Sequence, residues 1–237
     1  QSANRIPARL SFVDIAGLVR GASKGEGLGN QFLANIREVD AIAHVLRCFE
    51  DSDITHVEGK IDPLADADTV ETELMLADLE SLEKREANLR KKAITKDKEA
   101  IAELELVDLA LAELREGRPA RKADIPENRA RDWKNLQLIS SKPVIYVCNV
   151  EEDSAESGNS LSAEVAKKAA VENAEAVVIS ARIEEELAQL DDAERLEYLE
   201  TLGLTEPGLN RLIRQGYGLL DLITYFTAGP KESRAWT

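Results

Sequence analysis

A glycine-rich stretch directly after a short apolar run constrains the fold of this chain more than any other feature. The apolar run lies within residues 10–13, and Asp14 and Gly17 follow it in the spacing Asp-x-x-Gly. Four of the nine residues 21–29 are glycines, and a helical pattern comes next. We predict a buried strand over about residues 8–14, then a glycine loop, then a helix.

The residue types at this turn suit phosphate and metal chemistry. An aspartate at the carboxyl end of a strand lies where α/β sheets bind ligands, so Asp14 can hold Mg2+ through a water. Gly17 has no Cβ, so its N–H can approach a terminal phosphate. Strand, Asp-x-x-Gly, glycine loop and helix follow in this order in P-loop nucleotidases. A plain turn with a flexible loop is the alternative.

Further apolar runs and helical patterns alternate along the chain, which implies right-handed parallel crossovers. The predicted strands are residues 41–49, 142–149 and 176–180, and the predicted helices are 30–40, 127–139, 161–172, 183–190, 193–202 and 209–222. Leucines at helical spacing over residues 69–92 and 99–114 predict an antiparallel helical hairpin. Thr69 is the predicted N-cap of this hairpin, and Gly117 is its predicted end.

These elements predict an α/β fold: an incomplete, three-layered Ras-like P-loop nucleotidase core with an inserted antiparallel α-helical hairpin. The core is assigned to residues 1–63 and 141–223, the helical coiled-coil insertion to 64–140, and a linker to 224–237. Because Gln1 comes directly before a predicted strand, we expect an upstream piece to be missing.

Two more predicted strand ends carry polar residues. Asn149-Val150-Glu151-Glu152 follows one strand, and Ser180-Ala181-Arg182 follows the next. Guanine-nucleotide proteins have Asn-Lys-x-Asp and Ser-Ala-Lys at these places. Here Val150 and Glu152 replace the lysine and the aspartate, and the longer acid does not give guanine its paired acceptor. Guanine recognition is therefore weakened, and adenine becomes plausible.

With these motifs the chain resembles the Obg-related YchF/Obg-like ATPases over nearly all its length. The matching segments are FVDIAGLV (12–19), GASKGEGLGN (21–30), RCFE (47–50), GKIDP (59–63), EPGLN (206–210), TYFTAG (224–229) and RAWT (234–237). The resemblance implies a Ras-like domain, a helical insertion and a following C-terminal TGS domain. It also implies binding and hydrolysis of ATP in preference to GTP with Mg2+, and association with ribosomes, for which we predict the large subunit.

The chain departs from a complete family member in two respects. It lacks the phosphate-binding motif and the threonine switch that family members carry upstream of this segment, and it ends where the TGS domain should begin. No Gly-x-x-x-x-Gly-Lys-Ser/Thr motif is present in these residues. Since that motif supplies the phosphate cradle and its lysine, we expect a molecule made only of these residues to bind ATP poorly and to be inactive.

The residue that positions the attacking water is a separate question. Ras-like enzymes use a glutamine directly after the Asp-x-x-Gly glycine, but this chain has Leu18 there. His56 lies in an acidic loop after a predicted strand, where neighbouring acids would suit it to orient or deprotonate water. The resemblance also favours His56 as the catalytic residue. An ordinary loop histidine is the alternative.

Composition limits the remaining possibilities. The net charge of −15 argues against general binding of nucleic acid by the whole surface. One local basic cluster is a candidate binding site, although a solvated helix face explains it as well: Arg118, Arg121, Lys122, Arg129, Arg131 and Lys134. No apolar run reaches the length of a membrane span, and two cysteines fit a reducing cytoplasm. We predict a cytoplasmic monomer.

Two alternatives to an ATPase stay open. One is a GTPase of the same fold. The other is a non-catalytic interaction module that binds its partner through the helical hairpin.

Overall fold

The computed structural model describes residues 3–15, 28–50 and 61–237. Its central sheet has the order β2-β3-β4, with β2 (Ile42–Arg47), β3 (Val144–Asn149) and β4 (Glu175–Ile179). β3 and β4 run parallel, with Asn149 opposite Ile179. Backbone hydrogen bonds from Ile42 to Pro143 (3.0 Å) and from Cys48 to Asn149 (2.8 Å) keep one offset between β2 and β3, as parallel pairing requires.

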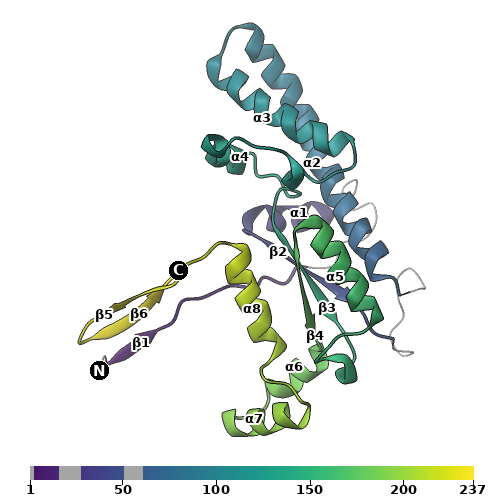
Figure 1. Cartoon of the computed structure of the whole chain (residues 1–237). Coiled ribbons are helices and arrows are strands. Elements are labelled where there is room, and N and C mark those ends of the chain that lie inside the picture. Colours follow the sequence, from purple (N-terminus) through teal and green to yellow (C-terminus); the bar gives the residue numbers. More distant parts are fainter. Residues whose placement is uncertain (1–2, 16–27, 51–60) are drawn as a thin grey trace. The chain divides into compact units, whose positions relative to one another are not determined.

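Two helices cover opposite faces of this sheet (Figure 1). α5 (Ser160–Glu172) connects β3 to β4, and α8 (Gly208–Leu219) comes later in the chain. Val147 of β3 packs in one cluster with Leu212 of α8. Strand side chains alternate between faces, so the neighbouring Tyr146 points the other way, where its hydroxyl donates to Glu172 of α5 at 2.8 Å. A parallel sheet between helical layers confirms the predicted α/β fold.

The first predicted strand is not formed. Residues 7–15 have no regular secondary structure, and Phe12 and Val13 are 51% and 60% exposed. A strand requires a neighbour that pairs with its N–H and C=O groups, and this segment has no ladder partner among the described residues. Leu10 instead lies beside α8, where a Cβ on Gly216 would come within 3.1 Å of Leu10 Cδ2. The prediction of a buried strand over residues 8–14 is wrong.

The predicted helical hairpin is present. α2 (Pro63–Ile94) and α3 (Lys98–Arg115) run antiparallel (Figure 1). Their apolar stripes meet in a core cluster whose most buried members include Leu82, Leu106, Val107 and Leu111. Heptad-like leucine spacing therefore identified both helices correctly.

The ends of the hairpin differ in how well the sequence located them. α2 begins at Pro63, because proline suits a first helical position, where an N–H would have no partner. The Thr69 hydroxyl donates to the Ala65 carbonyl at 2.8 Å inside the helix, so its assignment as N-cap is wrong. α3 ends at Arg115 and is followed by Gly117 with a φ of 72°, which confirms the predicted end.

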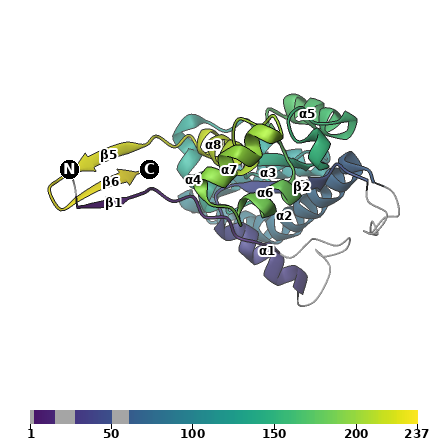
Figure 2. The same ribbon diagram turned by 90° about the horizontal axis from the view of Figure 1, so that it is seen from below.

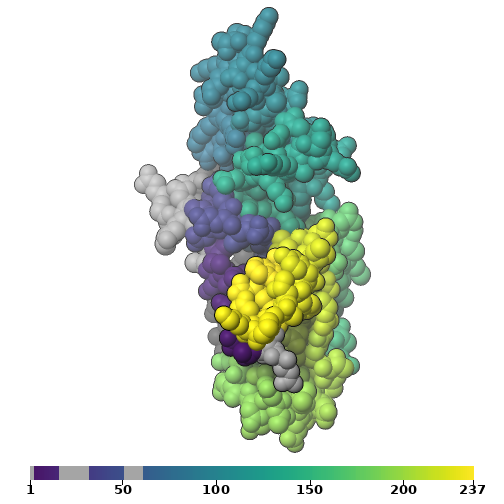
Figure 3. All heavy atoms as spheres, turned by 90° about the vertical axis from the view of Figure 1, so that its left-hand side faces the viewer, coloured from purple at the N-terminus to yellow at the C-terminus, as the bar shows by residue number. Residues whose placement is uncertain are grey.

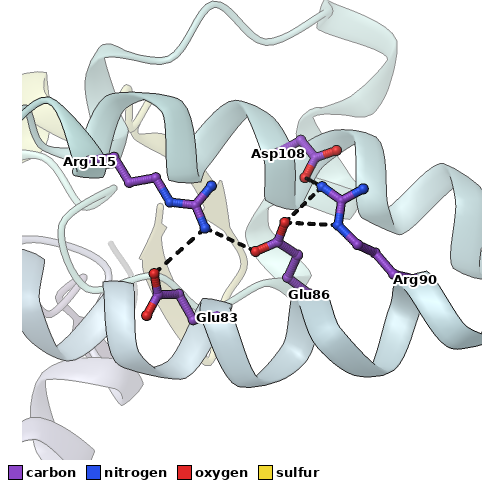
Figure 4. A network of polar contacts seen from close by, with 5 residues as sticks. All are labelled: Glu83, Glu86, Arg90, Asp108 and Arg115. Carbon is purple, nitrogen blue, oxygen red and sulfur yellow. Dashed lines mark hydrogen bonds and ion pairs between the residues drawn. The ribbon is translucent and has the colours of Figure 1, made fainter.

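An ion-pair network links the surfaces of α2 and α3 (Figure 4). Glu86 of α2 lies at its centre and accepts from Arg90 at 2.7 Å and from Arg115 at 3.0 Å. Arg90 also reaches Asp108 of α3 at 3.0 Å, and Arg115 lies 3.6 Å from Glu83. The hydrogen bond from Arg90 is the main reason why the pKa of Glu86 is lowered.

A buried carboxylate fixes the segment that follows the hairpin. Asp78 of α2 is 1% exposed and accepts from the backbone N–H groups of Ile139 (3.0 Å) and Ser140 (2.7 Å). The Ser140 hydroxyl donates to the same carboxylate at 2.7 Å. Lys142 donates to the carbonyls of Arg37 and Val39, at the end of α1 (Leu28–Glu38).

A second, smaller sheet joins both ends of the chain (Figure 2). β1 (Asn4–Ile6) pairs in parallel with β6 (Glu232–Trp236), which pairs antiparallel with β5 (Tyr225–Ala228). The tail assigned as a linker over residues 224–237 therefore contains two strands. Its assignment as a linker towards a further domain stays a prediction.

The remaining helices are short, and one differs from its prediction. They are α4 (Ala130–Asn135), α6 (Ala181–Leu187), α7 (Asp192–Thr201) and the 3-10 turns η2 (Ala120–Lys122), η3 (Glu127–Arg129) and η4 (Glu152–Ser154). The helix predicted over residues 127–139 is reduced to η3 and α4, because Gln137 adopts a φ of 54° and ends the helical path.

Contacts divide the chain into two compact units. One comprises residues 1–14, 43–64 and 144–237, and the other comprises residues 15–42 and 65–143. The predicted boundaries between core, insertion and linker stay predictions.

Candidate functional site at the carboxyl ends of the sheet strands

The carboxyl ends of β2, β3 and β4 are tied together by backbone hydrogen bonds. Cys48 N–H donates to the Asn149 carbonyl at 2.8 Å, and Val150 N–H donates to the Ile179 carbonyl at 2.9 Å. Val150 is 3% exposed, so this edge is rigid and well packed. The polar residues that follow β3 and β4 are therefore held next to each other.

The Asn149 side chain bridges the two loops. Its Oδ1 accepts a hydrogen bond from the backbone N–H of Ala181 at 2.9 Å. Asparagine suits this position because a short amide can reach across one strand spacing and accept from a backbone donor. Two of the predicted motifs, far apart in sequence, are thus in direct contact.

Ser180 and Glu152 are close in sequence to the two residues of this contact. Ser180 is 3% exposed, and its hydroxyl has no hydrogen-bond partner among the described residues. Glu152 is more exposed and forms an ion pair with Arg182, whose Nε lies 3.0 Å from Glu152 Oε1. The edge therefore presents one buried hydroxyl and one surface carboxylate that is partly neutralised.

Two further polar residues support the loop after β3 and were not predicted. The side-chain amide of Asn159 donates to the Cys48 carbonyl at 2.6 Å and to the Glu151 carboxylate at 3.1 Å. Hydrogen bonds from Ser154 and Asn159 lower the pKa of Glu151. The capping box of Asn159 and Ser162 was the signal in the sequence that could have identified this residue.

Asp14 is the one predicted phosphate-side residue within the described chain. It is exposed and has no hydrogen bond or ion pair to any described residue. A free carboxylate fits Mg2+, which proteins often hold through one or two carboxylates together with substrate phosphates. No group of three or more histidine, cysteine, aspartate or glutamate side chains that could hold a metal occurs in the described parts.

The other two predicted residues, Gly17 and His56, lie outside the described residues. The remaining histidine, His44, lies on β2, where its ring packs at 6.0 Å from that of Tyr146. This ring contact gives His44 a packing role. The site residues as a set stay predictions.

Comparison with known proteins agrees with the sheet and its loops. A family model described as "50S ribosome-binding GTPase" matches residues 2–77. The chain is 53% identical over 232 residues to the "Ribosome-binding ATPase YchF" of Haemophilus influenzae, an alignment that covers 98% of this chain and 64% of that protein. The protein of the same name from Bacillus subtilis is 49% identical over 234 residues, with the same coverage. The chain belongs to the YchF/Obg-like family.

A solved structure of the YchF/Obg-like family has the same fold. It is the "Structure of the Schizosaccharomyces pombe YchF GTPase", which superposes with a TM-score of 0.84 at 35% identity and covers 99% of this chain and 64% of that one. The chain thus spans 64% of the length of these relatives, which is just under two thirds. Among the described helices, none combines the length and the apolar character that a membrane crossing needs.

Proposed function

We propose that the complete protein containing this chain is a ribosome-associated switch that binds and hydrolyses ATP in preference to GTP. One observation carries the proposal: Asn149 joins the loops after β3 and β4 by its 2.9 Å contact with Ala181. The relatives are named ribosome-binding ATPases, which supports the partner and the nucleotide. The residues described here supply the base-binding edge, and we propose that they are inactive without the rest of the protein.

The chemistry of this edge favours adenine. Guanine has a carbonyl O6 that needs a donor and two adjacent N–H donors that need a paired acceptor. The Ala181 N–H is already engaged by Asn149, and the Glu152 carboxylate is shared with Arg182. Adenine needs only one acceptor at the same edge of the base, for its amino group, so fewer hydrogen-bonding groups of the loop have to be free.

The phosphate side is assigned from the sequence. We propose that Asp14 holds Mg2+ through a water and that the Gly17 N–H contacts the terminal phosphate. When bound, Mg2+ would neutralise charge on the phosphates. We propose that His56 orients the attacking water, since Leu18 cannot form a hydrogen bond.

The large ribosomal subunit is the proposed partner, since the matching family model is described by its 50S binding. Cytoplasmic location and a monomeric state remain predictions of the sequence.

Competition between ATP and GTP for the complete protein tests the nucleotide assignment. A fluorescent ATP analogue is displaced by unlabelled ATP or GTP in the presence of Mg2+, and hydrolysis of each is measured. We expect ATP to compete more strongly and to be hydrolysed faster. Stronger competition by GTP would support the alternative of a GTPase, the name given to the Schizosaccharomyces pombe relative. Binding of neither nucleotide would support a non-catalytic interaction module.

A further inference from the structure

The turn between α2 and α3 is basic in a chain that is otherwise strongly acidic. The nine residues 91–99 contain four lysines and two acids, whereas the whole chain has a net charge of −15. The four lysines and Ile94 are all exposed, and Ile94 is 83% exposed. Figure 3 shows this turn at the far end of its own unit, with no other segment of that unit over it. The four residues Lys91, Lys92, Lys96 and Lys98 are called the tip lysines below.

The tip lysines differ from the other basic residues of the hairpin because they are not neutralised. The ammonium groups of these four lysines form no ion pair or hydrogen bond with any residue that the structure describes. By contrast, the basic cluster suggested by the sequence is largely engaged: Arg118 pairs with Glu113, Arg121 with Glu71, and Arg129 with Asp132. The unpaired positive charge of the hairpin is therefore at its turn.

Local stability explains only two of the tip lysines. Lys91 and Lys92 lie in the last turn of α2, where a positive charge is favoured by the helix dipole. Lys98 is the first residue of α3, where the same dipole favours an acid. Lys96 has a φ of 62°, in the left-handed region that suits glycine or asparagine. Two lysines thus lie where the backbone disfavours them, which points to a role outside the fold.

The backbone of the turn is held firmly. Thr95 and Lys96 donate backbone N–H groups to the carbonyls of Lys92 (3.0 Å) and Ala93 (2.9 Å). The Asp97 carboxylate caps α3 by accepting from Glu99 N–H (3.0 Å) and Ala100 N–H (3.2 Å), so one of the two acids is directed at the backbone. A fixed turn presents its charges with little loss of backbone entropy on binding.

We infer that the tip lysines form a docking surface for the phosphate backbone of RNA, and that this surface is where the protein contacts ribosomal RNA. The inference rests on the proposed ribosome association and adds the contact surface and its chemistry. Charge complementarity selects the occupant, because closely spaced lysines on an acidic protein match a polyanion. The acidic remainder of the surface would repel RNA, which confines the contact to the tip.

The test uses the complete protein, purified ribosomes and protein-free ribosomal RNA. One variant replaces the tip lysines by glutamine, and a second replaces them by arginine to keep the charge. The control replaces three other exposed lysines by glutamine, all outside the tip and outside the basic cluster of residues 118–134: Lys84, Lys167 and Lys231. Circular dichroism confirms that each variant is folded.

We expect the glutamine variant of the tip to bind protein-free ribosomal RNA at least about tenfold more weakly at roughly 0.15 M salt. The slope of log affinity against log salt should fall by about three, since each lost phosphate contact removes about 0.7 to 0.9. Its sedimentation with ribosomes should fall in parallel. The arginine variant and the control should bind as the parent does.

Each other result has a defined meaning. If the parent does not sediment with ribosomes, the proposed function fails; tip-dependent binding of protein-free RNA would still support the surface. If the parent binds ribosomes and the glutamine variant of the tip binds equally, the inference fails and the proposed function stands. If Ile94→Ser abolishes ribosome binding while the glutamine variant of the tip does not, the tip contacts a ribosomal protein, and the inference is overturned.

Discussion

Asp78 and Ser140 are joined by two hydrogen bonds, since the backbone N–H and the hydroxyl of Ser140 both lie 2.7 Å from Asp78 Oδ2. Together with the hydrogen bond from the Ile139 N–H, the carboxylate accepts three hydrogen bonds and donates none. Its two oxygens can accept all three hydrogen bonds, which the oxygen and the NH2 group of an amide in the same place could not do. This buried contact fixes the segment that leads from the hairpin towards β3.

Replacing Asp78 should therefore destabilise the chain, even when the new side chain is asparagine, which has nearly the same shape as aspartate. In Asp78→Asn the amide NH2 would face a donor at one of the two oxygen positions, and we expect a loss of about 2 kcal/mol in the free energy of unfolding. Urea titration measures this. The exposed Asp124→Asn serves as control and should change stability by less than about 0.5 kcal/mol. Equal effects of the two substitutions would contradict the role given to Asp78.

The pH dependence of stability gives an independent check. Burial raises the pKa of Asp78, and hydrogen bonds from Ser140 and Ile139 oppose this only in part. An acid whose pKa is raised by folding binds its proton more tightly in the folded state. Its contribution to stability is complete below the unfolded pKa and is lost as pH rises through the folded pKa. The stability difference between the parent and Asp78→Asn should therefore grow as pH is lowered from 7 towards 4, measured by urea titration at each pH. A difference that shrinks over this range would show that the shift has the opposite sign.

The Glu86 network should contribute modestly to the hairpin. Glu86→Gln removes the charge shared by Arg90 and Arg115, and we expect a loss of about 0.5–1 kcal/mol that decreases in high salt. Glu83→Gln is the matched control. Glu83 lies on the same helix but is more exposed, and its contact with Arg115 is longer, at 3.6 Å. Its effect should be smaller, and thermal unfolding at low and high salt measures both. A loss that is independent of salt would mean that packing, and not charge, is responsible.

Asn149 should influence which nucleotide binds to the complete protein. Asn149→Ala releases the Ala181 N–H, which then becomes available to the O6 of guanine. We expect the preference for ATP over GTP to fall by roughly two- to tenfold, the range that one hydrogen bond supplies. Displacement of a fluorescent nucleotide measures both affinities. An unchanged ratio of the two affinities would show that the Ala181 N–H does not contribute to the preference for ATP.

Lys96 should show that charge at the turn is kept at the expense of stability. Lys96→Gly relieves the left-handed backbone, and we expect the free energy of unfolding to rise by about 0.5–1 kcal/mol. Lys96→Ala removes the charge without relieving the backbone, so it should leave stability near that of the parent. Urea titration separates the two, and equal stability of the glycine and alanine variants would contradict the strain argument.

Periodicity predicted most of the fold. The leucine spacing located α2 and α3, because each helix buries one face against the other. The apolar runs located β2, β3 and β4, because this sheet lies between two helical layers, and β3 is buried on both faces. The strand predicted over residues 8–14 failed, since a strand depends on a partner that its own residues do not specify. The two strands of the tail were missed for a related reason: β6 is held by β1, from the opposite end of the chain.

The site was predictable only where short motifs follow strands. Asn149 and Ala181 are brought together because parallel strands end at one edge, and the motifs themselves named both residues. Glu151 and Asn159 were missed. The capping box was a local signal for Asn159, but its hydrogen bond to the Cys48 carbonyl joins residues 111 positions apart, which no local pattern encodes. The tip lysines were missed as well, since sequence does not tell a paired cation from a free one.

The pairing of β1 with β6 has a consequence for how the protein is made. Residues 4–6 must wait for residues 232–234 before that parallel ladder can form, so the small sheet closes a loop of nearly the whole chain. Long loop closures are slow and come late in folding. During synthesis the central sheet and the hairpin can fold first. The small sheet can form only after translation has passed Trp236, because β6 must be present to pair with β1.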